Sequence, residues 1–130
     1  MLDLKNSNFA ELEQIGEPEA TALVGMLLSP DEQIVAAFEG PDTNVIFTND
    51  RLLTLIVGGV TGKKRYFTSL WYNTIVCIEL QTTTLDAPNP KLELLFRDVG
   101  LARLGFKGHF NIGSLYAKIS ELTRGQTEPA

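Results

Sequence analysis

A mainly β (α+β) domain, with seven short antiparallel strands closed by one C-terminal helix, is the fold that the sequence predicts. Between residues 33 and 107, short apolar segments alternate with turn signals at roughly regular spacing, which favours a β-sandwich or a small barrel. After residue 111 the apolar residues change to helical spacing. The length of 130 residues is that of one domain, so we treat 1–130 as a single unit.

The strand positions follow from the turn residues between them. Residues 49–50 are Asn-Asp and residues 58–62 hold three glycines, so both segments form turns, and they define three successive antiparallel strands. Leu92, Leu94 and Phe96 alternate with other residues, as on a strand with one buried face. We expect strands at 33–39, 43–49, 51–58, 64–71, 75–83, 91–97 and 102–107.

Two short helices are expected in the N-terminal segment, residues 1–30. Phe9, Leu12 and Ile15 recur at a spacing of three residues, which indicates a first helix. Pro18 suits the first turn of a second helix, because the N–H that proline lacks would be unpaired there. The second helix has an amphipathic stripe made of Ala20, Leu23, Val24, Leu27 and Leu28.

The last predicted element is a helix over residues 111–124. Asn111 is a suitable N-cap, and Gly125 is a residue type that ends helices. The apolar stripe consists of Ile112, Leu115, Tyr116, Ile119 and Leu122. Because such a stripe must be buried, we expect this helix to cap the open end of the sheet.

Composition excludes several classes of function. A net charge of −5 and a pI near 4.8 argue against binding of nucleic acids or anionic membrane surfaces. Cys77 is the single cysteine and His109 the single histidine, so an internal disulfide and a zinc site of Cys and His alone are both excluded. We expect no cofactor and no metal. The longest apolar run, 52–60, is far shorter than the ~20 residues of a membrane span. The apolar stretch 20–28 follows acidic residues, whereas a secretory signal peptide has basic residues at that place. We therefore expect a cytoplasmic protein.

Three segments resemble the short bacterial pleckstrin-homology (PH) domain family: 45–53, with Thr-Asn-Asp-Arg-Leu at its centre, 59–64, with Thr-Gly-Lys-Lys, and 72–75. The resemblance covers about Leu27 to Leu122 and departs from the family pattern around 86–90. It implies a PH-like, partly open seven-stranded barrel plugged by the last helix. It also implies closed homo-oligomeric rings, with a pentamer as one candidate size, and no established enzymatic activity.

The basic residues Lys63, Lys64 and Arg65 follow a glycine-rich turn. Gly62-Lys63 is not a phosphate-binding loop of the Walker type, because Val57 stands where that motif requires glycine and no Ser or Thr follows the lysine. We interpret the three cations as the solvated tip of a hairpin, with contact to an anion or a partner as the alternative.

A second candidate binding site is formed by Thr48, Asn49 and Arg51. These polar residues either bind a ligand or, as turn residues, bond the nearby backbone while Arg51 pairs with an acid. The first hairpin loop, 39–43, contains two acids and no base. Eukaryotic relatives of the fold hold inositol phosphates with basic residues in this loop, so we do not expect phosphoinositide binding there. His109 and Cys77 have no evident catalytic partners, and we predict no catalytic residues.

The function expected from these observations is a non-catalytic PH-like interaction module that self-assembles and binds a protein partner. The alternatives are a lipid or membrane-surface adaptor that uses Lys63, Lys64 and Arg65, and an enzyme that acts on a small ligand. Four apolar residues expected to face outward are candidates for subunit contacts: Leu95 with Cys77 on one strand pair, and Val35 or Trp71 on the other side.

Overall fold

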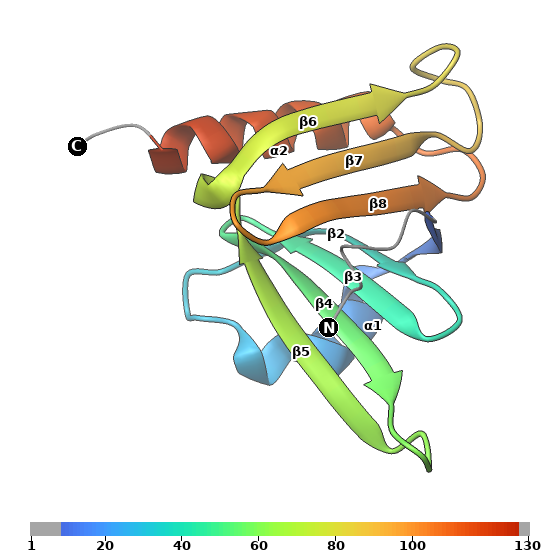
Figure 1. Ribbon diagram of the computed structural model, residues 1–130, viewed down its shortest axis with the longest axis vertical. Coiled ribbons are helices and arrows are strands. Elements are labelled where there is room, and N and C mark those ends of the chain that lie inside the picture. The colour runs from blue at the N-terminus through green and yellow to red at the C-terminus, as the bar shows by residue number, and fades with distance from the viewer. Residues whose placement is uncertain (1–8, 128–130) are drawn as a thin grey trace.

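One eight-stranded sheet, curled into a partly open barrel, forms the body of the molecule in the computed structural model (Figure 1). The structure describes residues 9–127, with the side chains of 125–127 left out. The elements are β1 (Ala10–Ile15), α1 (Glu17–Val24), the 3-10 turn η1 (Gly25–Leu27), β2 (Ile34–Glu39), β3 (Thr43–Thr48), β4 (Arg51–Gly58), β5 (Lys64–Trp71), the 3-10 turn η2 (Tyr72–Thr74), β6 (Ile75–Gln81), β7 (Lys91–Phe96), β8 (Gly100–Phe106) and α2 (Ile112–Thr127).

The mainly β fold with a C-terminal helix is confirmed, and all seven predicted strands are present as β2 to β8. The prediction is wrong for residues 10–15, which form an eighth strand, β1, and not a helix. The spacing of three residues between Leu12 and Ile15 suggested one face of a helix. On a strand, successive side chains point to opposite faces, so two residues three positions apart lie on different faces. Leu12 enters the barrel core, whereas Ile15 packs on the outer side. Residues 1–8 of the predicted helical segment lie outside the described residues.

Strand β1 joins the two halves of the barrel. It pairs antiparallel with β2, where Ile15 lies opposite Ala37, and parallel with β8, where Leu12 lies opposite Phe106. The strand order is therefore β5-β4-β3-β2-β1-β8-β7-β6. Strands β5 and β6 are the two terminal strands of this open sheet, so each has one side without a strand partner.

The second predicted helix is present as α1, with Pro18 in its first turn. Its buried residues Ala20 and Val24 pack against Ala37, Ile46 and Leu53 on the outer face of the first half of the sheet. The helix is shorter than the predicted stripe, which extends to Leu28, because the α-helix gives way to the 3-10 turn η1 at residue 25. Leu27, beyond the helix, is 46% exposed.

Helix α2 plugs the barrel, as predicted. Ile112, Leu115 and Ile119 are buried in the main core, and Figure 1 shows the helix running alongside β6. The Asn111 side chain caps the helix by accepting a hydrogen bond from the Ser114 amide at 3.0 Å. The predicted end at Gly125 is wrong, because the helix continues to Thr127.

A bulge at the start of β6 places two successive side chains on the outer face of the sheet. The register between β6 and β7 shifts between Ile75 and Cys77, so Val76 faces outward and is 50% exposed. Cys77 also faces outward, as expected, and lies directly opposite Leu95 on β7.

Candidate functional site

Thr48, Asn49 and Arg51 lie together at the turn between β3 and β4, where they bind the segment that precedes β2. The guanidinium of Arg51 donates two parallel hydrogen bonds of 2.9 Å to the carboxylate of Glu32, from Nε to Oε2 and from Nη2 to Oε1. The side chain of Glu32 is 1% exposed and that of Arg51 13%. This bidentate geometry is the strongest form of a side-chain ion pair.

Glu32 receives two further hydrogen bonds. The Thr48 hydroxyl donates to Oε2 at 2.6 Å, and the Ser29 amide donates to Oε1 at 3.2 Å. Burial by itself raises the pKa of Glu32, but the hydrogen bonds from Arg51, Thr48 and Ser29 outweigh it and hold the pKa below its ordinary value. The carboxylate is therefore ionised and saturated with donors in the folded protein.

The remaining donors of Arg51 hold neighbouring elements. Nη1 donates to the Ser69 hydroxyl at 2.9 Å, and Nη2 donates to the Leu27 carbonyl at 2.8 Å. The guanidinium also lies over the ring of Trp71, 5.1 Å from its centroid. Arg51 thus connects η1, the Glu32 segment and β5.

Asn49 and Tyr72 complete this network. The Asn49 side chain accepts from the Gln33 amide at 2.8 Å and donates to the Asp31 carbonyl at 3.2 Å. The buried Tyr72 hydroxyl donates to the Thr48 carbonyl at 2.7 Å. Burial, followed by the charge of Glu32, raises the pKa of Tyr72 above its ordinary value, so the hydroxyl stays protonated. The polar atoms of Thr48, Asn49 and Arg51 thus bond chiefly to the protein itself. Glu32, the partner of Arg51, was not identified from the sequence because a glutamate in the polar segment Pro30-Asp31-Glu32-Gln33 gives no signal of its burial.

The predicted basic residues lie on a hairpin that extends beyond the rest of the sheet (Figure 1). Strand β3 pairs with β4 only as far as Ile56, whereas β4 and β5 continue to pair to Gly58 and Lys64. We call residues 57–65 the basic arm. Lys63, Lys64 and Arg65 are exposed, and Val60 at the tip is fully exposed. None of the three cations has an ion pair with the described part of the chain.

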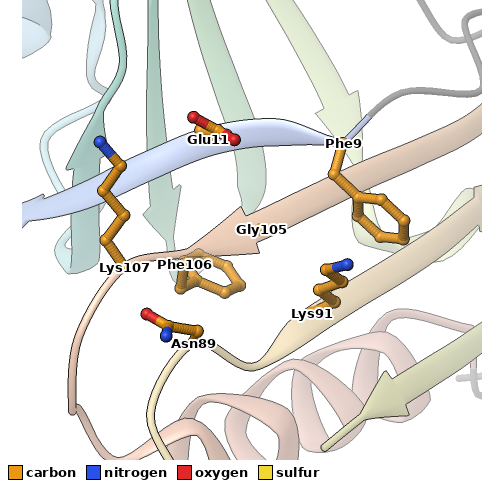
Figure 2. A pocket seen from close by; sticks show the side chains of 7 residues that line it. All are labelled: Phe9, Glu11, Asn89, Lys91, Gly105, Phe106 and Lys107. Atoms are coloured by element: carbon orange, nitrogen blue, oxygen red, sulfur yellow. The ribbon is translucent and has the colours of Figure 1, made fainter.

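A cleft of about 440 Å³ lies over the junction of β1, β7 and β8 (Figure 2). Its floor is Gly105, where a Cβ atom would meet the Ala10 carbonyl at 3.4 Å. Lys91 places its Nζ 4.9 Å from the centroid of the Phe9 ring, and Lys107 lies toward the other end of the cleft. Glu11 is the one acid in its lining. The lining contains no nucleophile beside a base, so this cleft has no evident catalytic chemistry.

A smaller depression of about 240 Å³ adjoins the β2–β3 turn and has an acidic rim. We call it the acidic depression; it is lined by Glu11, Glu13, Glu39, Gly40, Pro41 and Lys107. Glu13 and Glu39 lie directly opposite each other on β1 and β2. The sequence predicted an acidic hairpin loop at 39–43. It did not predict that Glu11 and Glu13 lie beside this loop, because residues 9–15 were assigned to a helix.

His109 and Cys77 do not form a catalytic arrangement. His109 is exposed, and its Nδ1 lies 3.2 Å from the carbonyl oxygen of Asp86. A hydrogen bond from Thr84 lowers the pKa of the Asp86 carboxyl. Within residues 9–127, no group of three metal-ligating side chains is found. The same part of the chain contains no helix that is long and apolar enough to span a membrane.

Exposed apolar side chains gather near both terminal strands of the sheet. Cys77, Leu95 and Leu101 form a row across the outer face of β6, β7 and β8, which we call the apolar row. Leu95 is 38% exposed. Trp71, at the end of β5, is 47% exposed and lies beside Arg51, as does Leu27. Val35 is exposed as well, on the bulge of β2.

Comparison with known proteins agrees with this architecture. A family model described as the bacterial PH domain matches residues 3–123. The chain belongs to the bacterial PH-domain family. No curated protein matches it.

Solved structures of bacterial PH domains share the fold of this family member. A DUF1696 family protein with a pleckstrin-homology domain from Shewanella loihica PV-4 superposes with a TM-score of 0.71 at 22% identity, over 88% of this chain and 98% of that one. A PH domain from Shewanella amazonensis SB2B gives 0.59 at 20% identity, over 92% and 94%. A PH-domain-containing protein from Exiguobacterium sibiricum 255-15 gives 0.66 at 14% identity, over 89% and 64%.

Proposed function

We propose that this PH-like domain is a non-catalytic interaction module of the cytoplasm, which assembles into a closed ring of identical subunits and presents a repeated surface to a protein partner. The observation that carries the proposal is the position of the exposed apolar residues. Two groups of them lie at the terminal strands of an open sheet: Trp71 on β5, and the apolar row, which begins on β6. The resemblance to ring-forming bacterial PH domains supports the same conclusion, and a pentamer is the candidate size.

A ring requires two different contact surfaces on each subunit. In a cyclic assembly every subunit meets its neighbour head to tail, so one surface must fit another and not itself. Trp71 and Leu95 belong to different halves of the sheet and so satisfy this requirement. Aromatic and apolar residues are enriched at such interfaces.

Light scattering on the purified protein at micromolar concentration tests the assembly. We expect a mass several times that of the 14.3 kDa chain. A mass near that of one chain would remove self-assembly from the proposed function. Independently of that result, a pull-down from native cell extract, with the mass of the assembly measured alongside, tests for the protein partner.

A lipid-surface adaptor is the second candidate, and the basic arm is the observation in its favour. Lys63, Lys64 and Arg65 are exposed beside the apolar Val60, a combination that suits the boundary of an anionic membrane. The net charge of −5 opposes this function. Co-sedimentation with anionic vesicles separates the two candidates, because only the adaptor requires binding to lipid.

A further inference from the structure

Two exposed charged surfaces of opposite sign lie on this chain without ionic partners in the part that the structure describes. Lys63, Lys64 and Arg65 form the positive surface on the basic arm. The exposed carboxylates of Glu13 and Glu39 lie on the rim of the acidic depression. Glu13 and Glu39 face each other across two paired strands, an arrangement of like charges that destabilises a sheet. A cation docked between them would remove this cost.

The two surfaces lie at the same end of the strands. In an antiparallel meander, alternate turns lie together, so the β2–β3 turn beside the depression and the β4–β5 turn of the arm point the same way. Strands β3 and β4 lie between β2 and β5. Val57, at the base of the arm, donates to the Asp42 carbonyl of the β2–β3 turn at 3.1 Å, but in the part of the chain that the structure describes no ion pair joins the cations of the arm to the acids of their own depression.

We propose that the basic arm of one subunit docks in the acidic depression of the next copy of the chain. The inference rests on the proposed self-assembly and adds a charged contact to the apolar contacts of Trp71 and the apolar row. The exposed side chain of Val60 enters the depression of about 240 Å³ between Gly40 and Pro41. The cations of the arm then reach Glu11, Glu13 and Glu39, which line that depression.

The position of the two surfaces fits a ring. A closed ring permits no shift along its axis between neighbouring subunits, so two surfaces that contact each other must lie at similar heights along that axis. For an axis along the strands, the arm and the depression lie at the same height because both belong to the same end of the sheet. A second copy also fits better than an anionic membrane, because the carboxylates at this end repel lipid phosphates.

Two charge-reversed variants test the contact. The first carries Lys63→Glu, Lys64→Glu and Arg65→Glu, and the second carries Glu11→Lys, Glu13→Lys and Glu39→Lys. Each variant alone brings like charges together at every contact, and we expect its dissociation constant to rise at least about tenfold at 0.1 M salt. An equimolar mixture restores opposite charges at every contact between unlike chains, so association should return; in a ring of five, where two chain types cannot alternate completely, one like-charge contact remains and the recovery is partial. Recovery in the mixture also shows that both variants are folded.

Sedimentation velocity on each variant and on the mixture gives the result. If the wild-type protein is an oligomer and the arm-reversed variant assembles equally well, the inference is overturned while the proposed self-assembly stands. A mixture in which unlike chains do not associate at all overturns it as well. If the arm-reversed variant instead keeps its assembly but loses binding to phosphatidylserine vesicles at physiological salt, the arm contacts membranes and not a second copy. A monomeric wild-type protein refutes both the self-assembly and this contact.

Discussion

Replacing Arg51 by methionine tests whether the buried network around Glu32 stabilises the fold. The substitution keeps much of the length of the side chain but removes both hydrogen bonds to the carboxylate, each 2.9 Å long. It also removes the bonds to the Ser69 hydroxyl and the Leu27 carbonyl. Glu32, whose side chain is 1% exposed, retains only the donors from Thr48 and Ser29.

The expected loss is about 3–5 kcal/mol of unfolding free energy at pH 7.5, because an ionised carboxylate is left buried without its counter-charge. Arg103→Met is the matched control. Arg103 pairs with Glu93 at 3.2 Å, but these two side chains are 30% and 20% exposed. Such partly solvated pairs contribute about 0–1 kcal/mol. Both variants lose one arginine and one ion pair, so the difference between them reflects the burial of the Arg51–Glu32 pair together with the further hydrogen bonds of Arg51.

The pH dependence distinguishes a lost ion pair from lost packing. In the wild-type protein the Glu32 pKa is below its ordinary value of 4.5, so its stabilising effect is present above pH 4.5 and disappears as the pH falls through the lowered pKa. Without Arg51, burial dominates and we expect the pKa of Glu32 to rise above 4.5. Protonation then relieves the buried charge, and the deficit of the Arg51→Met variant should shrink between pH 7.5 and pH 4.

Urea unfolding followed by far-ultraviolet circular dichroism at both pH values measures this deficit. Fluorescence is unsuitable because Trp71 lies against Arg51. A second substitution, Glu32→Gln in the Arg51→Met background, removes the buried charge and should restore part of the stability. The reasoning is refuted if Arg51→Met costs no more than Arg103→Met, or if its deficit is the same at pH 7.5 and pH 4.

Three further predictions concern the plug, the assembly and lipids. Ile119→Ala, at a residue 1% exposed, should cost about 2–5 kcal/mol in chemical unfolding, and a shift below about half a kcal/mol would place α2 outside the core. Leu95→Glu should dissociate the oligomer while circular dichroism stays unchanged, and an intact oligomer would exclude the apolar row from the interface. Vesicles containing phosphoinositides should not retain the protein at physiological salt. Retention that Lys63→Glu with Lys64→Glu abolishes would favour the lipid adaptor instead.

The sequence determined strands β2 to β8 and the helical plug because their signals are local. Turn residues such as Asn49 and Gly62 limit strands directly, and the stripe of α2 has the helical period over two turns or more. Asn111 caps the helix through a hydrogen bond to a residue three positions away, which sequence spacing can anticipate. For these elements, local preference and tertiary packing favour the same structure.

Only the tertiary structure decided the role of residues 10–15. Alternation of Glu11, Leu12 and Glu13 is a strand signal, but it is too short to outweigh the spacing of three that links Leu12 to Ile15. The choice is made by the partners: β2 on one side and β8 on the other provide the backbone hydrogen bonds that an isolated segment lacks.

The charged surfaces also depend on residues far apart in sequence. Glu32 becomes a buried anion because Arg51, 19 residues away, reaches it, and nothing near Glu32 in the sequence encodes that contact. Glu13 and Glu39 face each other because β1 pairs with β2 in that register. The sequence thus determined which residues are charged and where the chain turns. Which charges are buried, paired or left exposed was decided by strand pairing, because burial and electrostatic environment are properties of the assembled sheet.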